Sequence, residues 1–307
     1  MNEQRSSEPG HWFHRRGTLG SDGWESVVDD AIPGWEHTGL RVAEIGEPDV
    51  LELPGREVER VVVPLSGAFM VTHGSRPDTV ETLLQGRRSV FHGPTDVLYL
   101  PSGTPAEVRG SGRVAVAEAR TAEQRPWRYI PATEVPVELR GAGRSSRQVH
   151  NFGTVAALDA ARIIVCEVVT PAENWSSYPP HKHDETVPGR ESRLEEIYYF
   201  ESAPARGSLA GATDAAFGMF SAYSSTAGEI AVDATVRTGD IALVPFGYHG
   251  PAAAAPGYDL YYLNVMAGPD PQRAWLITDD PAHAWVRGSW EGQELDSRLP
   301  YSDDAEG

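Results

Sequence analysis

The fold is decided by the stretch Asp240-Ile-Ala-Leu-Val-Pro-Phe-Gly-Tyr248, which repeats the pattern of Asp96-Val-Leu-Tyr-Leu-Pro-Ser-Gly-Thr104. In each stretch an aspartate precedes an apolar segment that ends in Pro-x-Gly. Residues 57–67 stand before the first stretch much as residues 195–200 stand before the second. A pair of elements that recurs in this way indicates one β module that occurs twice in tandem.

Short segments rich in β-branched residues surround both stretches. The chain has 307 residues, of which 31 are Gly and 24 are Pro, and this composition disfavours long helices. The segments expected to form antiparallel strands are 58–64, 67–72, 89–91, 97–100, 106–109, 113–118, 161–169, 195–200, 217–223, 241–245 and 259–266. We therefore predict an all-β protein of two antiparallel, jelly-roll-like β-barrel modules. Residues 1–140, with an N-terminal arm, form the first and residues 141–307 the second, and a polar, Arg- and Gly-rich stretch at 138–147 connects them.

The formal net charge of -18 argues against nucleic acid and membrane surfaces as partners, because both are anionic. The N-terminal arm carries Glu, Arg and His in place of the apolar core of a signal peptide, and no apolar run is long enough to span a membrane. We expect a soluble cytoplasmic protein whose partner is a small molecule. The sequence leaves a homo-oligomer open.

Most of the chemical information lies in three stretches of the second half. They are Tyr178-Pro-Pro-His-Lys-His-Asp184, Leu194-Glu-Glu-Ile-Tyr-Tyr-Phe200 and Phe246-Gly-Tyr-His249. Alternate side chains of a strand share a face, so His181 and His183 point the same way. Glu196 opens the next strand, and His249 follows the strand at 241–245. Three imidazoles and one carboxylate suit Zn, Mn, Fe, Ni or Co, so these residues predict a divalent metal site.

The identity of the carboxylate ligand depends on the strand register. A slip by one residue would turn Glu195 toward the metal in place of Glu196, which keeps Glu195 open as the rival ligand. The first module has no comparable set, because His73 and His92 stand alone and are expected to be ordinary loop or surface histidines. We therefore predict one divalent metal per chain, in the second module only.

Motifs in both halves are similar to those of one known family. The second half contributes Asn174-Trp-Ser-Ser-Tyr-Pro-Pro-His-Lys-His-Asp184, Leu194-Glu-Glu-Ile-Tyr-Tyr-Phe200, Gly257-Tyr-Asp-Leu-Tyr-Tyr-Leu-Asn-Val-Met-Ala-Gly268 and Asp280-Pro-Ala-His-Ala-Trp285. The first half contributes Thr38-Gly-Leu-Arg41, Val63-Pro-Leu-Ser-Gly67 and Ser89-Val-Phe-His-Gly-Pro94. On these motifs the chain resembles the 5-deoxy-glucuronate isomerases of myo-inositol catabolism. One departure from ordinary cupins is that residues 184–195 separate the second His from the Glu, where only a few residues are usual.

The resemblance implies a bicupin whose C-terminal cupin holds a divalent metal, with Zn or Mn expected, through the residues that match His181, His183, Glu196 and His249. It also implies an aldose-ketose isomerisation, in which 5-deoxy-glucuronate becomes 2-deoxy-5-keto-gluconate by proton exchange alone. The candidates for proton relay or base are Tyr198, Tyr248 and Glu195. The candidates for substrate binding are Arg190, Lys182 and Arg193 for the carboxylate of the sugar acid, and Asn264 and Tyr262 as residues that line the barrel.

Other functions stay open at this point. Two histidines and a carboxylate are also the ligands of non-heme iron dioxygenases. The hexulose-uronate ketol-isomerase of pectin breakdown shares the ligand pattern but matches the quoted motifs less well. A non-catalytic sugar-binding bicupin would have the same fold, although it would not need four metal ligands.

Overall fold

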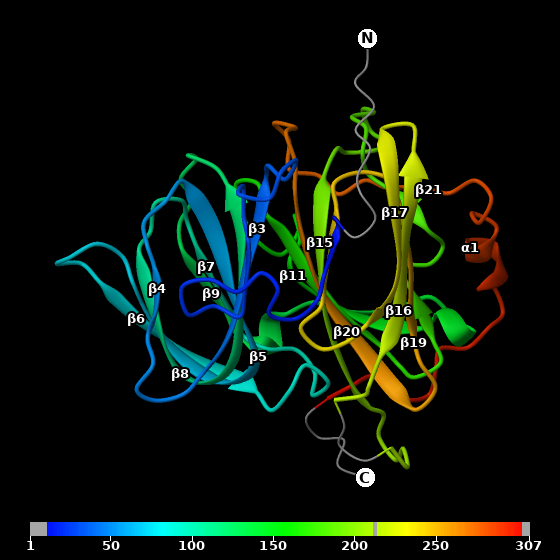
Figure 1. Cartoon of the computed structure of the whole chain (residues 1–307), viewed down its shortest axis with the longest axis horizontal. Coiled ribbons are helices and arrows are strands. Elements are labelled where there is room, and N and C mark those ends of the chain that lie inside the picture. The colour runs from blue at the N-terminus through cyan, green and yellow to red at the C-terminus, as the bar shows by residue number, and fades with distance from the viewer. Residues whose placement is uncertain (1–10, 211–213, 303–307) are drawn as a thin grey trace.

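The structure is a computed structural model that describes residues 11–210 and 214–302. Two β modules lie side by side, the first from blue to cyan-green and the second from green to red (Figure 1). Within the described ranges, α-helix is confined to the short α1 (Val286–Ser289). The all-β, two-module prediction is therefore confirmed.

The first module is an eight-stranded antiparallel sheet. Its strand order is β2-β3-β8-β5-β7-β9, with β4 paired to β8 and β6 paired to β5. The strands are β2 (Ser26–Val28), β3 (Thr38–Ile45), β4 (Leu51–Leu53), β5 (Val58–His73), β6 (Val80–Arg87), β7 (Val97–Leu100), β8 (Ala106–Arg120) and β9 (Arg128–Ile130). One turn of 3-10 helix, Ala132–Glu134, follows β9, and another, Gly143–Ser145, lies between two paired strands of the second module.

Two antiparallel sheets form the second module. The seven-stranded sheet has the order β1-β18-β15-β20-β12-β11-β10, and the six-stranded sheet has the order β17-β16-β19-β14-β21 with β13 paired to β19. The strands of the first are β1 (Phe13–His14), β10 (Val137–Arg140), β11 (Arg147–Gly153), β12 (Ile164–Thr170), β15 (Glu195–Pro204), β18 (Ile241–Val244) and β20 (Tyr258–Ala267). Those of the second are β13 (Trp175–Ser176), β14 (His181–Lys182), β16 (Gly218–Ser225), β17 (Gly228–Val236), β19 (Tyr248–Ala254) and β21 (Thr278–Asp279).

The modules do not divide at residue 140. β10 pairs with β11, so the second module begins before residue 141 and the stretch expected to be a connector contains a strand. β1 pairs with β18, so the N-terminal arm also belongs to the seven-stranded sheet. β10 alternates apolar and charged residues but has only four of them, and β1 has only two, so neither is long enough to be recognised as a strand from its sequence.

The repeated stretches form matching strands. β7 and β18 each have four residues and each follows an aspartate. Asp96 accepts hydrogen bonds from the backbone of residues 85 and 86, and Asp240 accepts them from the backbone of residues 16 and 237. In both modules the aspartate therefore ties a neighbouring segment to the start of the strand.

Carboxylates hold the two modules together. Glu59 of β5 accepts the backbone N–H groups of residues 161–163 at 2.6 to 2.8 Å. Glu195 of β15 accepts the backbone N–H groups of residues 36–38 at 2.6 to 3.2 Å. Arg87 of the first module also reaches Glu167 of the second, where two N–O distances of 2.7 Å join fully buried side chains. Each module thus contains carboxylates whose hydrogen-bond donors come from the other module.

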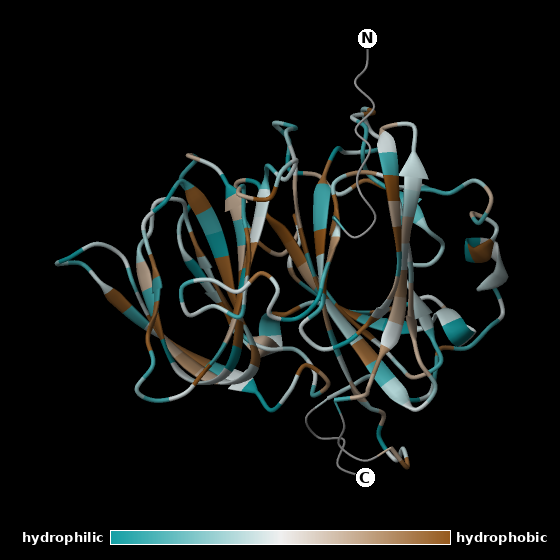
Figure 2. Cartoon of the chain, in the orientation of Figure 1, coloured by the Kyte–Doolittle hydropathy of each residue, from teal (hydrophilic) through white to brown (hydrophobic). Residues whose placement is uncertain are grey.

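Apolar side chains follow the strands of both modules, as the brown segments of Figure 2 show. One buried cluster runs through both modules, and a second, which includes Phe69, Leu84 and Leu98, lies within the first module. No helix in the described part of the chain has the length and apolarity needed to cross a lipid bilayer.

Candidate metal centre and active site

Three side chains from different parts of the second module converge on one point. Glu196 lies in β15, His249 lies in β19, and His183 follows β14. All three are buried, and their candidate ligand atoms lie within 4.8 Å of one another. Glu196 Oε2 is 2.9 Å from His183 Nε2 and 3.1 Å from His249 Nε2. Nitrogen and carboxylate donors at this spacing are the ligand types that divalent transition metals prefer.

Backbone carbonyls orient the imidazole rings. The Nδ1 atoms of His181, His183 and His249 donate to the carbonyls of residues 179, 194 and 247 at 3.1 to 3.2 Å. This pattern leaves each Nε2 atom for the metal, as in known metal sites. The Nε2 atom of His249 is buried and has no partner in hydrogen-bonding geometry among the described residues. A ligand atom of a metal site has this property.

The pKa shifts of Glu196 and His181 suit a cation, whereas burial lowers the pKa of His183 but the hydrogen bond and charge of Glu196 outweigh it and raise that pKa. Burial raises the pKa of Glu196, but the hydrogen bond of His183 and the charges of His249 and His183 outweigh it and bring the pKa to about 2. Burial, together with the neighbouring His249 and His183, lowers the pKa of His181 well below its ordinary value. A charged carboxylate and a neutral imidazole are the forms that bind metal ions.

His181 borders this group on the side of a cavity. It lies opposite His249 in the pairing of β14 with β19, and its ring centroid is 4.6 Å from that of His249. The rings of His181 and His183 are 6.3 Å apart. The structure thus brings all four sequence-predicted ligands together. His183, Glu196 and His249 have their candidate ligand atoms closest to one another, and His181 lies beside them.

Lys182 does not fit the substrate-binding role expected for it. Its ammonium is bound by Asp184, Glu185 and Glu191 at 2.6 to 2.8 Å, so three carboxylates already compensate its charge. Asp184 also accepts the backbone N–H of Gly247 at 2.8 Å, and the carbonyl of Gly247 orients His249. Lys182 and Asp184 therefore position the turn that precedes His249, a candidate metal ligand.

Glu195 and Glu196 face opposite sides of β15. The carboxylate of Glu195 accepts the three backbone N–H groups of residues 36–38 and the hydroxyl of Thr38. These bonds hold the Glu195 carboxylate at the interface between the modules, away from the metal group, which consists of His183, Glu196 and His249. The structure thereby corrects the alternative in which Glu195 is a ligand or a base.

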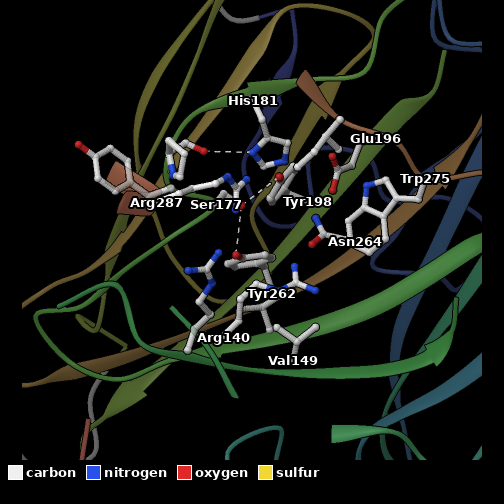
Figure 3. A pocket seen from close by; sticks show the side chains of 15 residues that line it. Arg140, Val149, Ser177, His181, Glu196, Tyr198, Tyr262, Asn264, Trp275 and Arg287 are labelled. Atoms are coloured by element: carbon white, nitrogen blue, oxygen red, sulfur yellow. Dashed lines mark hydrogen bonds between the residues drawn. The ribbon is translucent and has the colours of Figure 1, made fainter. Parts of the chain in front are cut away.

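A cavity of about 260 Å³ lies beside the metal group, between the two sheets of the second module (Figure 3). Pockets for drug-sized ligands measure roughly 300 to 1,000 Å³, so this one suits a smaller solute. Figure 3 shows His181 and Glu196 on one side of the cavity and Arg140 on the other. The two ends of the cavity therefore differ in chemistry.

Three hydroxyl groups form a chain in the cavity, marked by dashed lines in Figure 3. Ser177 Oγ lies 3.2 Å from Tyr198 Oη and 3.1 Å from Tyr262 Oη. Burial raises the pKa of Tyr198 well above its ordinary value, so this phenol stays protonated. Gly250 permits the close approach of Ser177, because a Cβ at Gly250 would lie 1.8 Å from the Ser177 carbonyl oxygen. The protonated hydroxyl of Tyr198 can therefore donate a hydrogen bond.

Two buried donors that line the cavity have no partner among the described residues. They are Asn264 Nδ2 and Trp275 Nε1. Asn264 lies opposite Tyr198 in the pairing of β20 with β15, and its amide lies between Tyr262 and Glu196 in Figure 3. A buried donor without an acceptor costs about 1–3 kcal/mol. Oxygen atoms of a ligand would satisfy both donors.

Three other sequence-predicted residues lie outside the lining of the cavity. Tyr248 stacks on Tyr223 with ring centroids 5.5 Å apart. Arg190 and Arg193 are exposed in the segment between β14 and β15. The structure therefore does not place Tyr248, Arg190 or Arg193 beside the cavity, where proton relay and substrate binding were expected of them.

The sequence analysis missed the three arginines that do line the cavity, Arg140, Arg147 and Arg287. The first two come from the Arg- and Gly-rich stretch that was expected to be a connector, and the third lies in α1. The available signal was a cluster of arginines in an otherwise acidic chain.

The histidines of the first module have ordinary partners. His73 is buried in β5, with its Nε2 atom 3.0 Å from Thr82 Oγ1, so the expectation of a loop or surface residue was wrong for it. His92 Nδ1 lies 2.7 Å from Ser89 Oγ.

A model of the KduI/IolB family matches residues 13–286, which is most of the chain. The chain belongs to the KduI/IolB family. Two KduI/IolB relatives named 5-deoxy-glucuronate isomerase illustrate the similarity. The protein of Geobacillus kaustophilus (strain HTA426) is 39% identical over 262 residues, which cover 83% of this chain and 88% of the relative. That of Bacillus subtilis (strain 168) is 36% identical over 75% of this chain and 80% of the relative.

Solved structures agree with the fold of this KduI/IolB member. An IolB-like protein from Salmonella typhimurium LT2 is 34% identical, with a TM-score of 0.78 over 90% of this chain and 98% of that protein. The oxalate decarboxylase of Bacillus subtilis is 12% identical, with a TM-score of 0.55 over 82% of this chain and 74% of that protein, so it shows the fold alone. The predicted bicupin fold is confirmed.

Proposed function

We propose that the chain is a metal-dependent aldose-ketose isomerase that converts 5-deoxy-glucuronate to 2-deoxy-5-keto-gluconate in myo-inositol catabolism. The observation that carries the proposal is the group of His183, Glu196 and His249 beside a cavity lined with unpartnered donors and arginines. Relatives at 36–39% identity that are named 5-deoxy-glucuronate isomerase support the choice of substrate.

The donor set fits one divalent ion per chain. His183, Glu196 and His249 would hold the ion, and His181 would be the fourth ligand. When bound, such an ion is a Lewis acid toward the carbonyl and hydroxyl oxygens of a sugar. Zn and Mn both accept this combination of nitrogen and oxygen donors.

The hydroxyl chain gives the site a proton donor for substrate oxygens. Tyr198 stays protonated, so it can donate to the substrate oxygen that gains negative charge when a neighbouring carbon loses its proton. Ser177 and Tyr262 extend this chain of hydroxyl groups. The hydroxyl proton of Tyr198 can therefore bond either to a substrate oxygen or to Ser177 Oγ. Asn264 and Trp275 can orient the remaining oxygens of the sugar. The reaction moves only protons, so neither NAD nor O₂ is required.

The proposal is tested with purified protein, Mn or Zn, and 5-deoxy-glucuronate under nitrogen, with the product followed by NMR. We expect isomerisation without NAD, and loss of both bound metal and turnover in His249→Ala. Arg109→Met, at an exposed position of the first module, is the matched control and should retain both. Oxygen consumption with iron and no isomerisation would favour a dioxygenase, and sugar binding without any turnover would favour a non-catalytic bicupin.

A further inference from the structure

A buried guanidinium without a carboxylate partner lines the cavity. Arg147, the first residue of β11, is 6% exposed. Its Nη1 atom donates to the carbonyl of Ser145 at 2.9 Å, and its guanidinium lies 5.4 Å from the ring centroid of Trp290. Within residues 11–210 and 214–302, no carboxylate lies within 4.0 Å of its guanidinium, and the charge of Glu138 acts on it only from farther away. A buried cation without a counterion is costly, so an anionic ligand is the partner that this arrangement lacks.

The other two cavity arginines differ from Arg147 in this respect. Arg140 makes two hydrogen bonds to Glu138, and Arg287 forms a two-pronged pair with Asp279. Their side chains are 33% and 42% exposed, so both lie at the rim of the cavity. Their charges are already compensated by a carboxylate in direct contact, whereas the deeper Arg147 has no such contact in the described part of the chain.

The local backbone leaves room for this side chain. Gly141 has φ of +81°, and a Cβ there would lie 2.7 Å from Arg147 Nη1 and 2.1 Å from the Ser145 carbonyl oxygen. Burial lowers the pKa of Arg147 to about 10, with contributions from Arg140 and Arg287, and this value still leaves it charged at neutral pH. Glycine adopts the backbone conformation of Gly141 without strain, and its missing Cβ leaves room for the charged side chain beside the cavity.

The strand order separates Arg147 from the metal group. Glu196 lies on β15 and Arg147 on β11, with β20 and β12 between them, and both residues line the same cavity. From this geometry we infer that Arg147 binds the carboxylate of a sugar acid whose opposite end lies at the metal group, and so selects sugar acids over neutral sugars. The inference rests on the proposed function for the identity of the substrate.

The test compares wild type, Arg147→Met and Arg190→Met, each loaded with Mn. Binding of D-glucuronate and of neutral D-glucose is measured by calorimetry, and melting temperatures are recorded with and without each sugar. We expect Arg147→Met to weaken D-glucuronate binding by roughly 10- to 100-fold, the loss of one charge-assisted contact, and to change D-glucose binding by less than about twofold. Arg190→Met, which alters an exposed loop residue, should match wild type.

The melting temperature separates binding from a structural role. Removal of an uncompensated buried charge should leave the melting temperature of Arg147→Met, without sugar, equal to or above that of wild type, and D-glucuronate should no longer raise it. Arg147→Lys, which keeps the charge, should retain part of the preference for the acid. Wild-type binding without a preference for D-glucuronate, or unchanged binding in Arg147→Met, would overturn the inference. Because the test measures binding and melting temperature and not turnover, it still shows whether Arg147 binds a carboxylate if the protein proves not to be an isomerase.

Discussion

Replacement of Arg87 by Met should lower the free energy of unfolding by about 3 to 5 kcal/mol, because it leaves a buried carboxylate without its counterion. The guanidinium of Arg87 bonds both oxygens of Glu167 at 2.7 Å, and both side chains are fully buried between the modules. The other partners of Glu167 are His150 Nδ1 at 2.6 Å and Tyr261 Oη at 2.7 Å. Neither replaces a guanidinium charge.

The pKa of Glu167 gives a similar magnitude. Burial raises this pKa, but the charges and hydrogen bonds of Arg87 and His150 outweigh it and bring the pKa to about 2, against an ordinary value of 4.5. This difference corresponds to about 3 kcal/mol. Because the folded pKa lies below the unfolded one, the stability is fully present above about pH 4.5 and is lost as the pH falls toward 2. Arg87→Met should reduce this part of the pH dependence.

The assay is urea unfolding followed by tryptophan fluorescence at pH 7. Arg109→Met is the control, because Arg109 forms an exposed pair with Glu107 and should cost less than about 1 kcal/mol. The double variant Arg87→Met with Glu167→Gln should be more stable than Arg87→Met alone, since it leaves no buried charge unpaired. A loss below about 1 kcal/mol in Arg87→Met would refute the reasoning.

Glu196→Gln should lose most of its bound metal, whereas Glu195→Gln should keep the metal and lose about 1–3 kcal/mol of stability; equal metal loss in both would place Glu195 in the metal site. Tyr198→Phe should lower kcat by about 100-fold with unchanged metal content, as expected when one donor to a developing negative charge is removed. Retention of kcat would exclude that hydroxyl from the reaction. His73→Ala should change metal content and turnover by less than about twofold, because its ring contacts Thr82 in the first module. A second metal ion per wild-type chain would contradict that expectation.

Alternation and turn residues were sufficient to predict the two modules, but they left the register of β15 open between Glu195 and Glu196. β19 was missed, although it carries His249, because its sequence of Tyr, His, Gly, Pro and Ala has few residues with high strand propensity. Pairing with β16, β13 and β14 forms this strand instead. Non-local pairing of this kind leaves no signal in a short window of sequence.

The convergence of the candidate ligand histidines was predictable because a metal site requires particular donors at particular spacings. The cations of the cavity were not, because sequence shows where Lys and Arg occur but not which of them have counterions. Lys182 stands next to two ligands and is compensated by three carboxylates, whereas Arg147 comes from a stretch that looked like a connector and has none among the described residues. Only the folded arrangement distinguishes the two.

The most direct test of metal-dependent isomerisation is a titration of chelator-treated protein with Mn, in D₂O, with 5-deoxy-glucuronate as substrate. Formation of 2-deoxy-5-keto-gluconate should rise in proportion to added Mn and saturate at about one ion per chain, with deuterium at the new CH₂ position. Turnover that survives complete removal of metal, or full occupancy by metal without product, would contradict a metal-dependent isomerase.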